Sequence, residues 1–502
     1  MRALPLLILL TLPFVLSAPS ALAQSTTLWV ATDGSDLTGD GSEGDPWASI
    51  THAVDNAPDG SLVLVEPGTY TGRVRLRRSF AGGITVRSRV PYQARLRNDD
   101  RVIVAYEAQG ITLEGFDIAH SGPGSAALVI HIQDLIDGPG FTRRITLRDN
   151  VLHDSFNNDI LKINNGAGEI QVLGNLFYNQ TGSDEHIDIN SVSDVLVEGN
   201  VFFNDFEGSN RVNGNDTSSF IVIKDSDGTD GRLTGSERIT VRRNVFLHWQ
   251  GSSGSNFVLL GEDGNPFFEA RDVLVENNLM LGDSPEVMRA AFGVKGGKDV
   301  TFRHNTVVGD LPSLAFAFRL NTEGANPPNE NIVLRGNVWS DPSGTMGAEN
   351  PSRPDDFCDT PPGETASFTL RRNLYWNGPE PVPVDGGESV NVTDDPEALE
   401  VDPELPPVTG VVLPRWFPGS SLFADGSVSI AAVFEKLATT YGTPAAFAPG
   451  VNAGDPAHAP ADDLLGNPRD GSPDLGTVEA AGIFTDGFES GDVSGWSLPG
   501  AL

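Results

Sequence analysis

The 502-residue sequence contains a single cysteine, Cys358, so no disulfide can form within the chain and a cysteine-rich zinc site is excluded. Basic residues are scarce: 33 Lys and Arg stand against 68 Asp and Glu, which gives a net charge of -35. A surface this acidic repels phosphate backbones, which argues against nucleic acid as the main partner. With 39% hydrophobic and 20% charged residues, the chain is too apolar to be disordered and too polar for a membrane bundle.

Several catalytic motifs are also missing. The sequence has no G-x-S-x-G elbow, no glycine-rich phosphate loop and no H-E-x-x-H pair. Cys358 lies in a Pro- and Asp-rich stretch without a nearby histidine to activate it. Catalysis by a Ser or Cys triad is therefore unsupported.

The N-terminus predicts export. A positive start at Arg2 is followed by an apolar run and an A-x-A site at Ala21–Ala23, which is typical of a secretory signal peptide over residues 1–23. Its removal takes away one arginine and leaves a mature charge of -36. No later stretch reaches the ~18 apolar residues that a membrane span needs. We therefore expect a secreted monomer without a membrane span.

A repeat of the form apolar-x-apolar-x-x-Asn-apolar-apolar is the strongest signal in the sequence. Its asparagines are Asn150, Asn175, Asn200, Asn244, Asn278, Asn305, Asn337 and Asn373. Most spacings are too short for a strand with a covering helix, and no helical periodicity lies between copies. They suit coils of three short strands that stack into a parallel β-solenoid, because one coil cannot bury its apolar face alone. We expect the repeated asparagines to adopt the left-handed conformation at a bend and to form a hydrogen-bonded ladder.

The ends of the chain differ from the repeats. Residues 24–75 contain a short amphipathic helix (50–57) that is expected to cap the open end of the first coil. The β-helix itself is expected over 76–380. We expect a mostly irregular closing region over 381–482, with one short helix, and a polar tail over 483–502 that could associate with the cell surface.

An acidic cluster is the main candidate site. Asp184, Glu185 and Asp188 lie at the turn into one strand, and Asp159 enters the matching strand 25 residues before Asp184. Adjacent coils stack ~4.8 Å apart, so these carboxylates would repel one another unless a cation neutralises them. A dense set of hard oxygen ligands suits Ca²⁺. His186 is expected to be a structural or groove residue.

Three charged residues occupy outward positions in the alternation of inward and outward side chains along these strands. Lys162, Asp188 and Lys224 are expected to face outward on successive coils, with Lys224 one layer above the acidic cluster. A surface column of ion pairs, worth little energetically, is the alternative interpretation. Lys295 and Arg319 lie in matching strands and are interpreted as solvated or substrate-lining residues.

The repeat resembles the right-handed parallel β-helix of pectate-lyase-like proteins. Residues 29–36 and 44–70 are similar to an N-terminal module of secreted bacterial β-helix proteins, and residues 463–479 and 486–497 resemble closing and tail segments of exported proteins. The fold class that follows is all-β, a right-handed parallel β-helix with an N-terminal capping helix.

A narrower resemblance is to polysaccharide lyase family nine. That family's calcium site has an Asp after Asn on one coil and a D-D-x-x-D cluster on the next, with a catalytic Lys on a later strand. The matching residues are Asp159, Asp184, Glu185 and Asp188 as metal ligands and Lys224 as catalytic residue. The chain departs from the pattern in having Glu185 for Asp, Ile160 after the first Asp, and His186 and Ile187 where the family usually has Gly and Trp.

This resemblance implies a secreted, calcium-dependent polysaccharide lyase that cleaves an acidic polysaccharide such as pectate by β-elimination. Lys224 would remove the C5 proton, and Lys162, Lys295 and Arg319 would contact the substrate. Two alternatives remain open. One is a non-catalytic extracellular β-helix that binds glycans or acts as a surface adhesin. The other is a β-helix glycoside hydrolase, which requires paired carboxylates.

Overall fold

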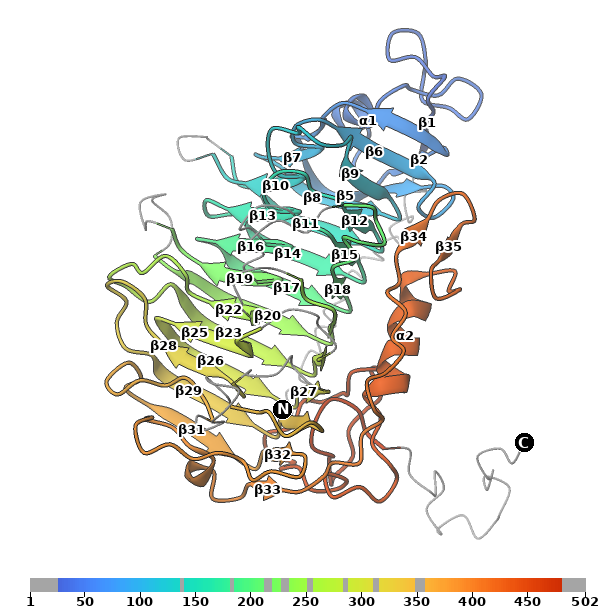
Figure 1. Cartoon of the computed structure of the whole chain (residues 1–502). Helices are drawn as coiled ribbons and strands as arrows, with labels where there is room; N and C mark the ends of the chain where they lie inside the picture. The colour runs from blue at the N-terminus through green and yellow to red at the C-terminus, as the bar shows by residue number, and fades with distance from the viewer. Residues whose placement is uncertain are drawn as a thin grey trace, which may run out of the picture.

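The protein is almost entirely built of parallel strands that coil around one axis (Figure 1). The computed structural model describes residues 26–135, 140–180, 185–211, 219–226, 234–250, 256–282, 288–309, 316–347 and 357–480. The expected right-handed parallel β-helix is confirmed. The predicted signal peptide, Asp184 and the predicted tail (483–502) lie outside the described residues.

Nine coils contribute one strand to each of three sheets, and the coils at the two ends contribute to only one or two of them. The first sheet contains β1 (Thr27–Val30), β2 (Leu62–Val65), β5 (Ser79–Ser88), β8 (Gln109–Glu114), β11 (Arg143–Arg148), β14 (Gly168–Leu173), β17 (Ser193–Glu198), β20 (Ser236–Arg242), β23 (Ala270–Glu276), β26 (Gly297–Arg303), β29 (Glu330–Arg335) and β31 (Phe368–Arg371). The second contains β3 (Gly68–Thr71), β6 (Ala94–Asn98), β9 (Asp117–His120), β12 (Val151–His153), β15 (Leu176–Tyr178), β18 (Val201–Phe203), β21 (Val245–Phe246), β24 (Leu279–Leu281), β27 (Thr306–Val308), β30 (Val338–Asp341), β32 (Leu374–Asn377) and β33 (Leu399–Glu400). The third contains β4 (Val74–Leu76), β7 (Ile103–Ala105), β10 (Ile130–Gln133), β13 (Leu161–Asn164), β16 (Ile187–Asn190), β19 (Ile221–Lys224), β22 (Asn256–Leu260), β25 (Ala290–Lys295) and β28 (Arg319–Asn321).

The asparagine ladder predicted from the repeat is confirmed at the bend between the first and second sheets. From Asn150 to Asn337, each ladder Nδ2 donates to the Oδ1 of the next asparagine at 2.9–3.0 Å. Each also donates to a backbone carbonyl of the preceding coil. At the far end, Asp395 accepts from Asn373 and terminates the ladder.

The predicted backbone conformation of these asparagines is wrong. The left-handed residue of each bend is the one before the ladder asparagine, such as Asp149 (φ 54°), Arg243 (φ 53°) and Gly199 (φ 72°). The preceding residue therefore turns the chain. The asparagine keeps an ordinary backbone conformation, and its amide is buried within the ladder.

The two ends of the solenoid are covered in different ways. Helix α1 (Ile50–Asn56) packs Ile50, Ala53 and Val54 over the first coil, and Ser49 caps its N-terminus. The C-terminal segment contains α2 (Ile430–Tyr441) and a short antiparallel pair, β34 (Trp416–Phe417) with β35 (Leu422–Phe423). This segment runs back along the side of the solenoid (Figure 1).

The C-terminal segment covers an apolar stripe on the outer face of the second sheet. The stripe includes Val151, Leu176, Val201, Val245 and Leu279, the residues directly after the ladder asparagines, and all are fully buried. The helix α2 contributes Ile430, Val433 and Leu437 to the same cluster. The expected closing region therefore forms a second hydrophobic core outside the coil. Among the described residues, no helix is long and apolar enough to cross a membrane.

Replacing one ladder asparagine should destabilise the whole solenoid. In Asn244→Leu, the backbone N–H and the side-chain amide of Asn200 lose their buried acceptor. We expect the free energy of unfolding to fall by about 3 kcal/mol, because buried donors are left unsatisfied. Chemical denaturation measures the effect, with the exposed Asn56→Leu as control. Equal midpoints for both variants would show that the ladder contributes little.

Candidate functional site

The outer face of the third sheet carries the predicted site residues. Lys162 on β13 pairs in register with Asp188 on β16. Lys224, on β19, pairs with Asn190 instead, and Val222 is the neighbour of Asp188. All three charged side chains face outward as expected, but Lys224 lies two residues further along its strand and does not continue the column.

A buried carboxylate triad forms at the entry to these strands. Asp159 is 2%, Glu185 3% and Asp188 1% exposed. One oxygen atom of each carboxylate lies within 4.8 Å of the others. The backbone N–H of Glu185 donates to Asp159 Oδ1 at 3.1 Å and links the two coils. The structure therefore brings together three of the four predicted metal ligands; the fourth, Asp184, is outside the described residues.

Two lysines lie beside the triad, and two further acids join it. Lys162 Nζ forms an ion pair with Asp188. Lys224 Nζ lies 2.5 Å from Glu262 Oε2 and 3.6 Å from Asp263 Oδ1. The group contains five carboxylates (Asp159, Glu185, Asp188, Glu262 and Asp263) and two ammonium groups, so negative charge is in excess when all are ionised.

The electrostatics of the triad reflect this excess. Burial, together with the carboxylates of Asp159, Glu262 and Asp188, raises the pKa of Glu185 well above its ordinary value. Asp188 Oδ1 is buried and accepts no hydrogen bond from any described residue. An oxygen-only donor set with surplus charge and an unsatisfied oxygen fits a hard divalent cation.

The pKa of Lys224 is raised, whereas a lysine that acts as a base near neutral pH requires a lowered pKa. Burial acts to lower it, but the carboxylates of Asp188, Glu262 and Glu185 outweigh burial and raise the pKa above the usual lysine value. In the protein alone, the Lys224 amine is therefore held in its protonated form.

Lys295 and Arg319 lie on the same face, beyond the acidic group. Lys295 Nζ is 2.5 Å from Glu323 Oε2, and Arg319 Nε is 2.7 Å from Asp359 Oδ2. Neither contacts the triad in the part of the chain that the structure describes. Both cations are neutralised locally.

Two members of the acidic group, Glu262 and Asp263, were not predicted from the sequence. They lie in the run L-L-G-E-D-G, at the end of a third-sheet strand, just as the predicted cluster lies in S-D-E-H, at the start of another. The buried carboxylate of Glu269 holds their loop in place, because it accepts from the backbone N–H groups of Glu262 at 3.0 Å, Asp263 at 3.1 Å and Asn265 at 3.0 Å. This loop fixes the partners of Lys224.

His186 is structural, one of the two roles expected for it. Its ring stacks on Phe220 at 4.4 Å, inside the solenoid, and Nε2 lies 3.1 Å from Asn204 Oδ1. Burial lowers its pKa to about 3. A neutral ring within an aromatic stack offers no acid–base function.

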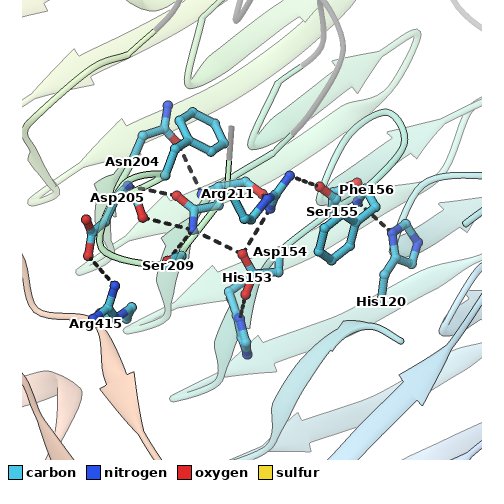
Figure 2. Close-up of polar contacts among 12 residues, drawn as sticks. His120, His153, Asp154, Ser155, Phe156, Asn204, Asp205, Ser209, Arg211 and Arg415 are labelled. Carbon is cyan, nitrogen blue, oxygen red and sulfur yellow. Dashed lines mark hydrogen bonds and ion pairs between the residues drawn. The ribbon is translucent and has the colours of Figure 1, made fainter. Parts of the chain in front are cut away.

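A separate polar cluster holds the turn that leads to Asp159 (Figure 2). Arg211 donates to Asp154 Oδ1 at 2.9 Å and to the carbonyl of Ser155 at 2.7 Å. The hydroxyl of Ser155 donates to the carbonyl of Asn158 at 2.7 Å. Arg211, which follows β18 in the sequence, therefore helps to hold the turn that leads to Asp159, although the two segments are far apart in the sequence.

Comparison with known proteins identifies the fold. No protein-family model and no curated protein matches the chain. Among solved structures, the pectate lyase Pel9A has 12% identity over 91% of this chain and 98% of its own, with a TM-score of 0.51. A rhamnogalacturonan lyase (13% identity, 75% of this chain, 87% of its own, TM-score 0.45) and a polygalacturonase from Erwinia carotovora ssp. carotovora (12%, 76%, 98%, 0.43) are more distant. The structural neighbours are polysaccharide lyases and related β-helix enzymes, and at these identities the likeness concerns the fold alone.

Removing the charge of Glu185 should stabilise the metal-free protein at neutral pH. A carboxyl whose pKa is raised by folding binds its proton more tightly in the folded state, so its contribution to stability falls as pH rises above the ordinary glutamate value. In EDTA, Glu185→Gln should therefore gain stability relative to the wild type between pH 4 and pH 7.5. Denaturant unfolding at the two pH values measures this.

The exposed residue Glu323 on the same face supplies the control. Glu323→Gln should show no comparable pH-dependent gain. A Glu185→Gln variant whose stability difference from the wild type is the same at both pH values would contradict the electrostatic interpretation of the triad.

Proposed function

We propose that the protein is a secreted, calcium-dependent polysaccharide lyase that cleaves a uronic-acid polymer such as pectate by β-elimination. The observation that carries the proposal is the buried triad of Asp159, Glu185 and Asp188, with Lys224 on the same face one coil beyond. Sheets of this kind present side chains along an open face, where an extended polymer can lie.

Asp159, Glu185 and Asp188 would hold the calcium ion, and Asp184 is the proposed fourth ligand. Their surplus charge, and an Asp188 Oδ1 that accepts no hydrogen bond within the described part of the chain, support a cation at this position. When bound, Ca²⁺ would neutralise the sugar carboxylate and make the neighbouring C5 proton more acidic.

Lys224 is the proposed base. Its amine would accept the C5 proton, and the electron pair left at C5 would form the C4–C5 double bond. The bond from C4 to the glycosidic oxygen would break at the same time, and the departing oxygen would take its electron pair and a proton from solvent water. The base must be neutral to act, and the surrounding carboxylates hold Lys224 protonated in the protein alone. Neutralising those carboxylates and working at alkaline pH both favour the active form.

Lys162, Lys295 and Arg319 are proposed substrate contacts. They face the same side of the third sheet as Lys224, and each already pairs with a carboxylate, Asp188, Glu323 or Asp359. A uronate group would compete with these acids for the cations. Because each cation would exchange one carboxylate partner for another, binding of the polymer would be readily reversible.

The ion pair between Lys224 and Glu262 also fits a second candidate, a non-catalytic β-helix that binds acidic glycans. Both candidates use the same face and the same ligand class. They differ only in whether Lys224 ever acts as a base.

Lyase activity is tested with polygalacturonate, measured by the absorbance of unsaturated products. We expect turnover that EDTA abolishes and that rises on the alkaline side of neutrality. Lys224→Ala should lower kcat by about 10³-fold, a typical effect of removing a general base. Lys298→Ala is the matched control, because Lys298 lies on the first sheet and pairs with Glu330. Reducing ends without double bonds would indicate a hydrolase, and binding without cleavage a glycan-binding protein.

Calcium binding is tested separately by thermal unfolding. At a calcium concentration of 100 times Kd, the folded state should gain about 2.7 kcal/mol, which raises Tm. Asp188→Asn should lose this gain, whereas Lys224→Ala and Asp359→Asn should keep it. A Tm that rises equally in Asp188→Asn would locate the ion elsewhere.

A further inference from the structure

The basic residues of this acidic chain are concentrated in one short stretch. Nine of the 33 Lys and Arg residues lie between residues 73 and 101, all of them arginines, and the only acids there are Asp99 and Asp100. The first complete coils are therefore positively charged in a protein of net charge -35.

One of these arginines, Arg75, lies on the sheet that carries the candidate site, and Arg73 and Arg77 flank its strand β4. Val74 and Leu76 of β4 point into the core, whereas Arg73, Arg75 and Arg77 alternate with them and are exposed. The strand β4 is the N-terminal edge of the third sheet. The arginines therefore share a face with the acidic triad and lie at one end of it.

Strand register connects the two positions. Starting from Arg75, the paired outward residues are Val104, His131, Lys162 and Asp188. Four strand spacings separate the ends of this line, or about 19 Å. A parallel line contains Gln133, Asn164, Asn190 and Lys224, and the ring of Tyr106 lies under the Arg77 guanidinium at 5.1 Å. Val104 and His131 are only 7% exposed, whereas Gln133, Asn164 and the Tyr106 ring are half-buried and offer amides and a ring that suit a sugar chain.

The cations on the two sides of the triad differ in how they are neutralised. Beyond the triad, Lys224, Lys295 and Arg319 each pair with an acid later in the chain. On the N-terminal side, the Arg75 side chain forms no ion pair or hydrogen bond with any described residue, while Arg73 and Arg77 each pair with one acid. An anionic polymer is therefore attracted more strongly toward β4 than toward β28.

We propose that β4 forms a distal anion-binding subsite, in which Arg75, flanked by Arg73 and Arg77, binds carboxylates of a polyuronate chain that extends from the triad toward the N-terminal edge of the third sheet. The inference rests on the proposed function, because the polymer is the same one that is cleaved beside Lys224. It adds the direction in which the polymer lies and a length below which a substrate cannot reach the subsite.

Chain length provides the test. A trisaccharide held at the triad is too short to reach β4, whereas polygalacturonate is not. In Arg75→Ala, the ratio of kcat/KM for polygalacturonate to that for trigalacturonate should fall about three- to tenfold, the range for losing an exposed charged contact. Arg75→Glu should lower the ratio further, and Arg75→Lys should restore most of it.

Arg95→Ala is the matched control, because Arg95 faces outward on β6 of the second sheet and also forms no ion pair among the described residues. It should leave the ratio unchanged. A second measurement does not need turnover: the affinity of Lys224→Ala protein for polygalacturonate should weaken, and become less dependent on salt, when Arg75→Ala is added.

The two proposals fail in different ways. Wild-type protein that neither binds nor cleaves polygalacturonate or alginate would overturn the proposed function, and this inference with it. Wild-type protein that cleaves the polymer, with the same chain-length ratio in Arg75→Ala and Arg75→Glu as in the wild type, would overturn this inference alone.

Discussion

The buried asparagine ladder is the interaction on which the rest of the structure depends. Each ladder side chain accepts from the backbone and amide of one neighbour and donates to the next, so a misplaced coil would leave several buried N–H groups without acceptors. The chain between ladder positions varies from 25 to 44 residues, yet every coil returns to the same point. The ladder thereby tolerates loops of different length while holding the strands of the first and second sheets in register.

Regular stacking has two consequences on the outside of the coil. On the second sheet, the residue after each ladder asparagine must point outward, and it is apolar at most positions, so the C-terminal segment is needed to bury that stripe. On the third sheet, charged and amide side chains such as Lys162 and Asn190 share the outward positions with the buried apolar residues Val222 and Leu259. The same periodicity therefore places an apolar stripe on one side of the coil and the acidic triad on another.

The sequence predicts the fold well, because each copy of the repeat contains both the apolar positions that are buried and the asparagine that forms the ladder. It predicts the site less completely. The sequence predicts Asp159 one coil below the cluster at 184–188, and the structure brings it together with Glu185 and Asp188. The 25-residue spacing does not give the exact register, because the pairing of Leu161 with Ile187 places Asp159 opposite Glu185. The register of Lys224 follows a long insertion, and no pattern in the sequence fixes how many residues such a loop consumes. Glu262 and Asp263 were missed because acidic turns are common in this chain and only the fold shows which of them meet.

The clustering of acids on the third sheet is electrostatically costly. Like charges are unfavourable when coils bring them within a few ångströms, so a chain with 68 acids would be expected to scatter them. Three of them are instead buried together, and the carboxylates around Lys224 hold its amine protonated. Buried charge of this kind costs stability unless something further is bound. In the proposed function, a cation would offset this cost, and Lys224 could act as a base only once the surrounding carboxylates are neutralised.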